Sequence, residues 1–429
     1  MVRKVVLCTL VGLFIFAGTA FAGGGRQQRD ANVLEIWSIQ VDGDGPGIFQ
    51  RAIERFNRSH PDIRVNLTKI ANDVFKQRLA VAMAAGQAPD LFHSWSGGPM
   101  FEYANNNQIL DLTPFFNANP AFRDRIMEGA LAQATYNGRI WGVPLTNISI
   151  ATIFYNREIF QRLNLRAPTT IGELENVADV LIANGITPFS LANATRWTGS
   201  MFFMYLATRR GGIEPFTRAV DGSGSFNHPA FIHAGERIQD WVRRGFFLPG
   251  FNGLDWDAGL ARAPLYRGET AMVLMGSWFV SQAQAESPEF AQIMGAFPFP
   301  RDEHGVGDPR EVVGTMGDNF YHINADTRNP EAAFRLLMYL LDDQAVEESV
   351  NDGRIPPVRG VRIDNPLLRE VFEQVNNATA VQLWYDQSLA PEVAHVHLIT
   401  SQEIFGLTRT SASAAQELHD AQQAYLRRR

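Results

Sequence analysis

Short β-prone segments alternate with amphipathic helical segments between residues 33 and 95. The β-prone segments span residues 33–37, 63–67 and 90–95, and apolar residues recur at helical spacing in the two intervals between them. Strands that are connected through helices pair in parallel with right-handed crossovers. The pattern therefore predicts an α/β fold in which Trp37 and Trp95 lie at the carboxyl ends of strands, where open sheets of this class bind ligands.

A second α/β pattern occupies residues 268–300. The apolar run 270–275 is bounded by glycines and is too short for a buried helix, so it predicts a strand that is covered on both faces. Gly276 permits a tight turn, Ser277 is expected to cap the following helix, and Trp278 falls in the first turn of that helix. The indole would then face a crevice, and the alternative is that it packs in the core.

The N-terminus has the pattern of an export signal. A basic start and an apolar run precede the small-x-small site at residues 20–22, so we expect residues 1–22 to be a signal peptide that is cleaved before Gly23. A periplasmic location in a two-membrane bacterium follows. The only cysteine is Cys8, so the processed chain would contain no disulfide and no cysteine-based site.

Charge and size narrow the possible partners. The formal net charge is −7, and no block of five or more like charges occurs, so neither nucleic acid nor an anionic membrane is an expected partner. A small neutral ligand fits this charge distribution better than nucleic acid or a membrane does. A chain of 429 residues with 45% apolar residues can bury more than one core, which predicts two lobes.

Eight short landmarks carry a resemblance to a known family. They are, in order, Pro89-Asp90, Asp111-Leu112-Thr113, Gly142-Val143-Pro144, Phe154-Tyr155-Asn156, Gly268-Glu269-Thr270-Ala271-Met272, Gly276-Ser277-Trp278, Phe297-Pro298 and Gly317-Asp318. Each landmark is weak alone, but eight in register are specific. The chain after residue 22 resembles the carbohydrate-binding group of extracellular solute-binding proteins, which includes the maltose-, raffinose- and xylobiose-binding proteins of ABC importers.

The resemblance implies the type II periplasmic binding protein fold, a Venus-flytrap arrangement of two α/β lobes joined by three crossovers. The expected lobes are residues 31–146 with 300–347, and residues 147–299 with 348–429. Hinges are expected near residues 145–150, 295–300 and 353–357. The resemblance further implies that a sugar is held between the lobes, and that closure presents the loaded receptor to the permease subunits of an importer.

Sugar chemistry selects the residue types expected in the cleft. Aromatic planes cover the C–H face of a pyranose, and the paired acceptors or donors of Asp, Asn and Arg satisfy its hydroxyl groups. A buried hydroxyl left unpaired would cost ~1 to 3 kcal/mol, so the polar groups choose the sugar. The candidate ligand-binding residues are Trp278, Trp384, Trp197, Trp95, Asp318, Asn319, Arg354, Asn147, Asp44 and Trp37.

Several of these side chains have a structural alternative. Trp37 could lie inside the first sheet, Asp318 could only shape its loop through an Asx turn, and Arg354 could pair with an acidic neighbour. Trp241 lies on the apolar stripe of a helix and is expected in the core. For Trp256, near a predicted helix start, both roles stay open.

Two functions of different classes fit this pattern. The first is a monomeric receptor for an oligosaccharide of two or more rings, with no enzymatic activity. The second is a secreted glycoside-cleaving enzyme, which would need two carboxylates ~5 to 9.5 Å apart. No motif ties Asp44 and Asp318 into such a pair, and no metal, cofactor or nucleophile motif occurs. The receptor is therefore the predicted function, without metal or cofactor.

Overall fold

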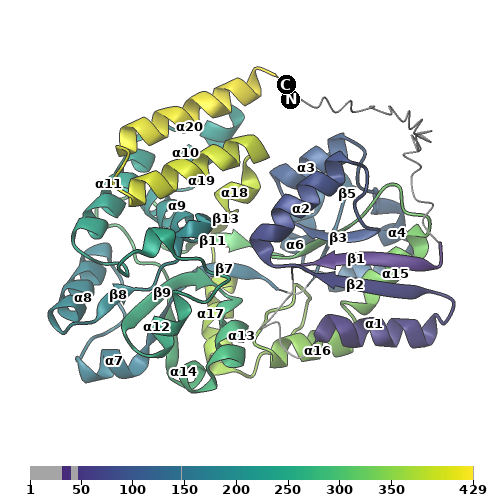
Figure 1. Cartoon of the computed structure of the whole chain (residues 1–429), viewed down its shortest axis with the longest axis horizontal. Helices are drawn as coiled ribbons and strands as arrows, with labels where there is room; N and C mark the ends of the chain where they lie inside the picture. Colours follow the sequence, from purple (N-terminus) through teal and green to yellow (C-terminus); the bar gives the residue numbers. More distant parts are fainter. Residues whose placement is uncertain (1–30, 40–46, 146, 429) are drawn as a thin grey trace, which may run out of the picture.

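The computed structural model describes residues 31–39, 47–145 and 147–428. It contains two α/β lobes, each built on its own sheet (Figure 1). The two-lobed α/β architecture is thus confirmed. The predicted signal peptide, residues 1–22, lies outside the described residues. No helix in the described part of the chain is long and apolar enough to cross a lipid bilayer.

The first sheet has the strand order β2-β1-β3-β12-β6. Strand β1 (Val33–Ser38) pairs in parallel with β2 (Arg64–Lys69) and with β3 (Leu91–Ser94). Strand β12 (Phe320–Ile323) is antiparallel to both β3 and β6 (Val143–Pro144). The parallel unit predicted from the first hundred residues is confirmed, and a strand from much later in the chain extends it.

Short and long helices surround this sheet. They are α1 (Ile48–Ser59), α2 (Asn72–Ala84), α3 (Gly98–Asn105), α4 (Thr113–Ala118), α5 (Pro120–Arg125), α6 (Glu128–Gln133), α15 (Pro330–Tyr339) and α16 (Asp343–Asn351), with a hairpin of β4 (Thr135–Tyr136) and β5 (Arg139–Ile140). Helix α1 buries Phe49, Ile53 and Phe56 and packs against α15 and α16. Its apolar residues recur at helical spacing, which aligns them on one face.

The second sheet has the order β13-β11-β7-β9-β8, with β10 beside β7. Its strands are β7 (Ser149–Asn156), β8 (Thr187–Phe189), β9 (Thr270–Gly276), β10 (Met294–Phe297), β11 (Glu311–Thr315) and β13 (Ala380–Gln382). Every residue of β9 is buried, which confirms the strand predicted to be covered on both faces.

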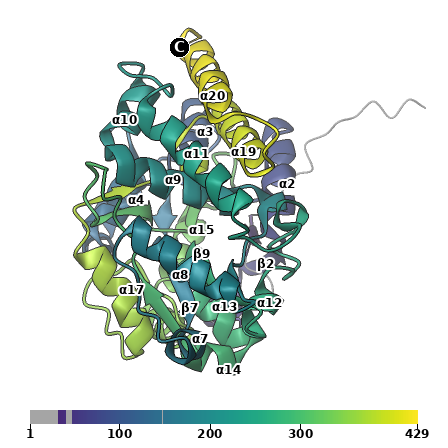
Figure 2. The ribbon, with the colours of Figure 1, turned by 90° about the vertical axis from the view of Figure 1, so that its left-hand side faces the viewer.

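The helices of the second lobe cover this sheet on both faces. They are α7 (Arg157–Arg162), α8 (Ile171–Ala183), α9 (Trp197–Gly211), α10 (Glu214–Asp221), α11 (Pro229–Arg243), α12 (Arg262–Tyr266), α13 (Phe279–Glu286), α14 (Pro288–Ile293), α17 (Pro366–Asn376), α18 (Tyr385–Ser388), α19 (Pro391–Phe405) and α20 (Ser411–Leu426), with the 3-10 turns Asn193–Thr195 and Phe251–Gly253. Figure 2 looks onto this lobe, with α8 and α11 on the near side.

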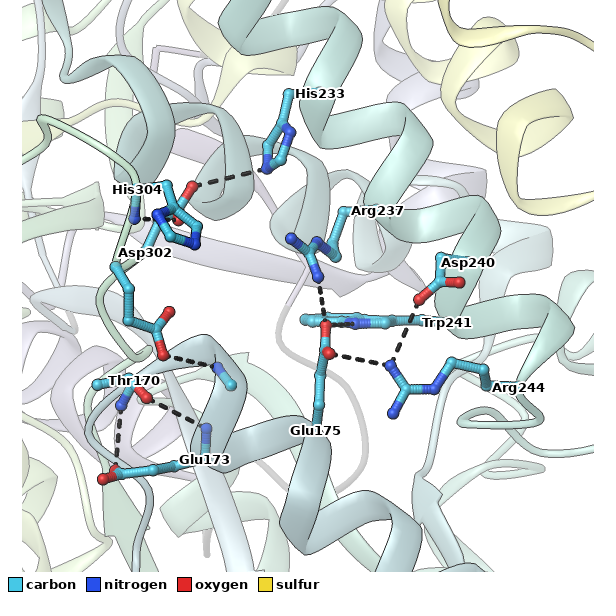
Figure 3. Close-up of polar contacts among 12 residues, drawn as sticks. Thr170, Glu173, Glu175, His233, Arg237, Asp240, Trp241, Arg244, Asp302 and His304 are labelled. Carbon is cyan, nitrogen blue, oxygen red and sulfur yellow. Dashed lines mark hydrogen bonds and ion pairs between the residues drawn. The ribbon is translucent and has the colours of Figure 1, made fainter.

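A polar cluster joins α8 to α11 at the periphery of the second lobe (Figure 3). The carboxylate of Glu175 accepts hydrogen bonds from Arg237 (2.7 Å), Trp241 (2.9 Å) and Arg244 (2.9 Å). Trp241 is fully buried, so its predicted place in the core is confirmed. The indole N–H is satisfied there by a carboxylate, as buried indoles require.

The chain leaves the first sheet after β6, enters the second at β7, and returns between β11 and β12. The return therefore lies at residues 316–319 and not at the predicted hinge 295–300, because β10 and β11 both pair with β7. The lobe boundary predicted at residue 300 moves accordingly. Gly314 permits this pairing, since a Cβ atom there would lie 2.2 Å from the carbonyl oxygen of Ser149.

Asn147 joins the segments that cross between the lobes. Its side-chain Oδ1 accepts a hydrogen bond from the backbone N–H of Ile355 (2.8 Å), and its backbone oxygen accepts one from Asp318 (2.7 Å). Its Nδ2 donates to Ser277 Oγ (3.2 Å). The N–H of Ile148 also donates to the carbonyl oxygen of Ile355 (2.6 Å). Segments far apart in sequence therefore meet at one buried asparagine.

Candidate functional site

A cavity of about 200 Å³ lies between the lobes. One water needs about 10–15 Å³ in the same measure, so the cavity has room for a ligand much larger than water. The first lobe contributes Ile39, Asn72, Lys76 and Trp95; the crossing segments contribute Asn147, Asp318, Asn319 and Arg354; the second lobe contributes Trp197, Met201, Met204, Trp256, Asp257, Trp278, Ser281, Gln282, Trp384, Asp386 and Gln387.

Eight of the ten predicted candidates line this cavity: Trp278, Trp384, Trp197, Trp95, Asp318, Asn319, Arg354 and Asn147. Trp37 is not among the lining residues, and its ring lies instead against the guanidinium group of Arg78, at 4.6 Å. Asp44 lies outside the described residues. The structure thus gathers eight side chains from loops and strand ends spread over most of the chain.

Four tryptophans of the second lobe form a continuous wall. The ring centroid of Trp197 lies 6.3 Å from that of Trp256 and 6.0 Å from that of Trp278. The ring centroids of Trp278 and Trp384 are 6.1 Å apart. Neighbouring planes are inclined by 70°, 62° and 59° respectively. Trp256, for which both roles were open, has both: it is 4% exposed in the core of the second lobe, and its ring is also part of the wall. Such a surface offers faces and edges to the C–H groups of a ligand.

Backbone geometry holds Trp278 in this wall. A Cβ atom on Gly276 would lie 2.1 Å from the indole ring, so the ring rests directly on the glycine backbone. The predicted helix cap at Ser277 is wrong. Trp278 is the N-terminal boundary residue of α13, where no side chain caps the helix, and Ser277 Oγ donates instead to the carbonyl oxygen of Ile148 (2.8 Å). A serine at this point ties the end of β9 to the crossing segment.

The first lobe presents a charged surface to the wall. Lys76 Nζ lies 5.1 Å from the ring centroid of Trp95, so the ammonium group covers a face of that indole. Lys76 also lies 3.9 Å from a carboxylate oxygen of Asp386 and 4.0 Å from one of Asp73. Trp95 therefore meets the cavity beside a cation and does not form part of the tryptophan wall.

Carboxylates and cations mix at the polar end of the cavity. Burial raises the pKa of Asp318 to about 7, with Asp386 adding to this effect and the charges of Arg354 and Lys76 opposing it. Burial also raises the pKa of Asp386, against the charge of Lys76. Arg354 Nε donates to Asp352 (3.0 Å), as its structural alternative predicted. The site can therefore exchange a proton near neutral pH.

Replacing Asp318 with Asn should change how stability depends on pH. Between about pH 4 and 7 the Asp318 carboxyl is ionised in the unfolded chain but keeps its proton in the folded protein, so the wild type loses stability as the pH rises through this window. We expect Asp318→Asn to remove this loss, on the order of a few kcal/mol. Thermal unfolding from pH 4 to 8 measures it.

The control for this experiment is Asp124→Asn, which removes an exposed carboxylate. Its unfolding curve should keep the same pH profile as the wild type. Profiles of wild type and Asp318→Asn that stay parallel from pH 4 to 8 would contradict the raised pKa of Asp318.

Three polar atoms in the cavity lining are buried without a hydrogen-bond partner among the described residues: Trp197 Nε1, Gln282 Oε1 and Gln387 Oε1. Buried polar groups are normally hydrogen-bonded, and an unpaired one costs about 1 to 3 kcal/mol. One donor and two acceptors in the lining are therefore available to bond with a ligand. Groups that carry both, such as hydroxyls, match this set.

Several lining residues have no signal in the local sequence. Lys76 borders the buried face of α2, and a lysine there ordinarily extends to solvent, while Gln387 lies on the short helix α18. Asp386 directly follows the Trp384-Tyr385 pair, so its position next to a predicted tryptophan was the only available indication. No group of three or more His, Cys, Asp or Glu side chains in the described ranges could hold a metal ion.

Comparisons with known proteins agree with this architecture. A family model described as bacterial extracellular solute-binding protein matches residues 42–347. The Multiple sugar-binding protein of Streptococcus mutans is 24% identical over 89% of this chain and 90% of its own length. An uncharacterised ABC transporter extracellular-binding protein of Pyrococcus horikoshii is 25% identical over 84% of this chain and 79% of its own.

Solved structures of other proteins are also similar to this chain over most of its length. A structure from work on xylan utilization by the thermophilic bacterium Caldanaerobius polysaccharolyticus matches with a TM-score of 0.85 and 26% identity, over 90% of this chain and 99% of the other. A chitin oligosaccharide binding protein matches with a TM-score of 0.81 and 23% identity, over 92% and 99% of the two chains.

Proposed function

Because this chain belongs to the family of bacterial extracellular solute-binding proteins, we propose that it is the receptor of an ABC-type sugar importer. It binds an oligosaccharide between its lobes and delivers it to the membrane permease subunits. Within the family we assign it to the carbohydrate-binding group that includes the maltose-, raffinose- and xylobiose-binding proteins. It acts as a monomer in the periplasm, after cleavage of its signal peptide before Gly23.

The wall of Trp256, Trp197, Trp278 and Trp384 carries this proposal. Its neighbouring ring centroids are 6.0 to 6.3 Å apart, so it offers apolar contact over more than one ring width. Indole faces match the C–H faces of pyranoses at little cost in side-chain entropy. We therefore propose a ligand of two or more sugar rings, which agrees with the sugar-binding name of the Streptococcus mutans relative.

The polar residues of the cavity supply the selectivity. Asp318, Asn319 and Arg354 lie on the crossing segments, and Gln282 and Gln387 belong to the second lobe. Their acceptors and donors can pair with ring hydroxyls whose directions depend on the stereochemistry of the sugar. The tryptophans then provide affinity for many glycans, and these polar groups distinguish among them.

Ligand binding favours the closed arrangement of the lobes. A ligand between the lobes contacts both walls only when they approach, so its higher affinity for the closed state shifts the population toward it. A shift from 1:99 to 99:1 requires about 5.5 kcal/mol of differential affinity. The residues around Asn147, Asp318 and Ile355 are the proposed hinge, because the crossing segments meet there.

A thermal-shift screen tests the receptor function. We expect one or more α- or β-linked di- and trisaccharides to raise the unfolding temperature, since a ligand at 100 times its Kd stabilises the folded state by about 2.7 kcal/mol. Mannitol and buffer alone serve as controls. No stabilisation by any neutral glycan would contradict the proposal.

The same samples test the glycoside-cleaving alternative. The cavity contains the carboxylates Asp257, Asp318 and Asp386, so their presence alone does not exclude an acid and base pair. A receptor leaves the bound sugar intact, and we therefore expect no release of reducing ends over a long incubation. Accumulating reducing ends, in proportion to protein concentration, would favour the enzyme.

A further inference from the structure

The two lobes touch each other directly at one edge of the cavity. Helix α3 of the first lobe begins at Gly98, beside the residues that end α18 of the second lobe (Figure 1). A Cβ atom on Gly98 would lie 2.1 Å from the backbone oxygen of Leu389, and one on Gly97 would lie 2.4 Å from that of Gln387. Backbone therefore meets backbone at both positions, and the side chain of Leu383 lies beside Gly97 as well.

Each side of this contact is anchored in its own lobe. Met100 of α3 is fully buried in the core around β3 and α2. On the other side, the ring of Tyr385 stacks on Phe216 with a centroid distance of 3.8 Å, and Leu389 is buried in the core of the second lobe. The contact therefore lies between two separately packed lobes and would break if they moved apart.

Different structural constraints act on Gly97 and on Gly98. Gly97 has φ +78°, a left-handed conformation that other residues avoid. Gly98 is the first residue of α3, has no such φ, and would meet only the backbone of the other lobe if it carried a side chain. Alanine is favoured over glycine in a helix, so the local structure of α3 gives no reason for glycine at this position.

Two polar contacts cross the cleft nearby. Helix α2 has Ala71 at its N-cap position and no cap from its own side chains, but the carboxylate of Asp257 in the second lobe faces the backbone N–H of Asp73. A carboxylate at this position is a favourable helix cap. Lys76 of α2 also pairs with Asp386 at 3.9 Å. Both contacts join α2 to the second lobe.

We propose that these contacts form a closure latch, in which the close approach at Gly98 and the Asp257 cap on α2 hold the lobes together before a ligand binds. These contacts would raise the fraction of ligand-free molecules that are closed. Less of the ligand's binding free energy is then needed to close the lobes, so its apparent affinity rises. The latch rests on the two-lobed fold and does not depend on which ligand the cavity takes.

Gly98→Ala tests the latch in the ligand-free protein. The methyl group would collide with a backbone oxygen only in the closed arrangement. We expect the ratio of closed to open molecules to fall about tenfold or more, because backbone cannot give way as a flexible side chain can. Asp257→Ala should lower the same ratio by about 2- to 5-fold, the effect of losing an exposed helix cap.

The ratio can be measured by single-molecule energy transfer between dyes on Val81→Cys and Val306→Cys. These residues are 71% and 84% exposed and belong to different lobes. The processed chain is expected to contain no other cysteine. Gly253→Ala is the matched control, because a Cβ atom there meets nothing within 4 Å and φ is not left-handed. It should leave the distance distribution unchanged.

Two results would overturn the latch: a ligand-free wild type that is entirely open, or a Gly98→Ala protein with the wild-type distance distribution and an unchanged unfolding temperature. If Gly98→Ala unfolds, Asp257→Ala measures the same ratio through the second contact. All of these measurements are made without sugar. Their outcome for the latch is therefore independent of the outcome of the sugar screen for the receptor function.

Discussion

Replacing Trp278 with Ala should weaken sugar binding by at least about 30-fold while the fold survives. Trp278 is in the middle of the tryptophan wall, between Trp197 and Trp384, and central aromatic anchors of a binding surface contribute about 2 kcal/mol or more. It is only partly buried and packs at the edge of the second lobe's core, so the fold should tolerate its removal. Isothermal titration with a sugar found in the thermal-shift screen measures the loss.

The matched control is Trp37→Ala. Trp37 is also partly buried, but it lies against Arg78 and not in the cavity lining. Its removal should leave the Kd within about twofold of wild type. Unchanged affinity in folded Trp278→Ala would show that the wall is not the sugar platform.

Gly276→Ala gives an independent test of the same surface. The new methyl group would occupy the position where the Trp278 indole now rests, at 2.1 Å from the ring. The indole must move, so affinity should fall although no tryptophan has been removed. If Trp278→Ala fails to fold, Gly276→Ala and Trp278→Phe separate a binding role from a structural one.

Replacing Asn147 with Ala should destabilise the protein by about 2 to 4 kcal/mol. The change leaves the N–H of Ile355 without its acceptor and removes the donor to Ser277 Oγ. Asn147 is 2% exposed, and each buried group that loses its partner costs about 1 to 3 kcal/mol. Urea unfolding, with the midpoint and slope fitted separately, measures the effect.

Two variants give the comparison. Ser277→Ala keeps the bond from Ile355 but removes the partners of Asn147 Nδ2 and of the Ile148 carbonyl oxygen, so it should destabilise the protein by a similar amount. Asn184→Ala removes an exposed asparagine that donates to the carbonyl oxygen of Val180, and should change stability by less than about 0.5 kcal/mol. An Asn147→Ala protein as stable as Asn184→Ala would mean that the crossing segments do not depend on this side chain.

Asn147 lines the cavity and also bonds to the protein itself. Its sequence position beside a crossover predicts a residue at the cleft, and it does line the cavity. Both ends of its amide, however, bond to the protein. Proximity to the site is therefore no measure of contact with a ligand, since a polar side chain at a crossing has backbone groups to satisfy as well.

The local sequence determined the secondary structure and much of the site. A short apolar run bounded by glycines marks strand β9. Helical spacing of apolar residues marks α1 and α2 between the first strands, because side-chain direction repeats every 3.6 residues along a helix. The same patterns locate tryptophans at strand ends and in loops, where the structure finds Trp95, Trp197, Trp278 and Trp384 around one cavity. These features depend on near neighbours in the chain.

Only the tertiary structure decided what depends on distant neighbours. Strand β11 pairs with β7 and so keeps the chain in the second lobe until residues 316–319, although its own sequence suits either sheet. Lys76 enters the cavity, and burial raises the pKa of Asp318, only because two lobes enclose them. The physical reason is the same in each case: strand pairing, burial and charge proximity are set by residues far apart in the sequence, which no local pattern records.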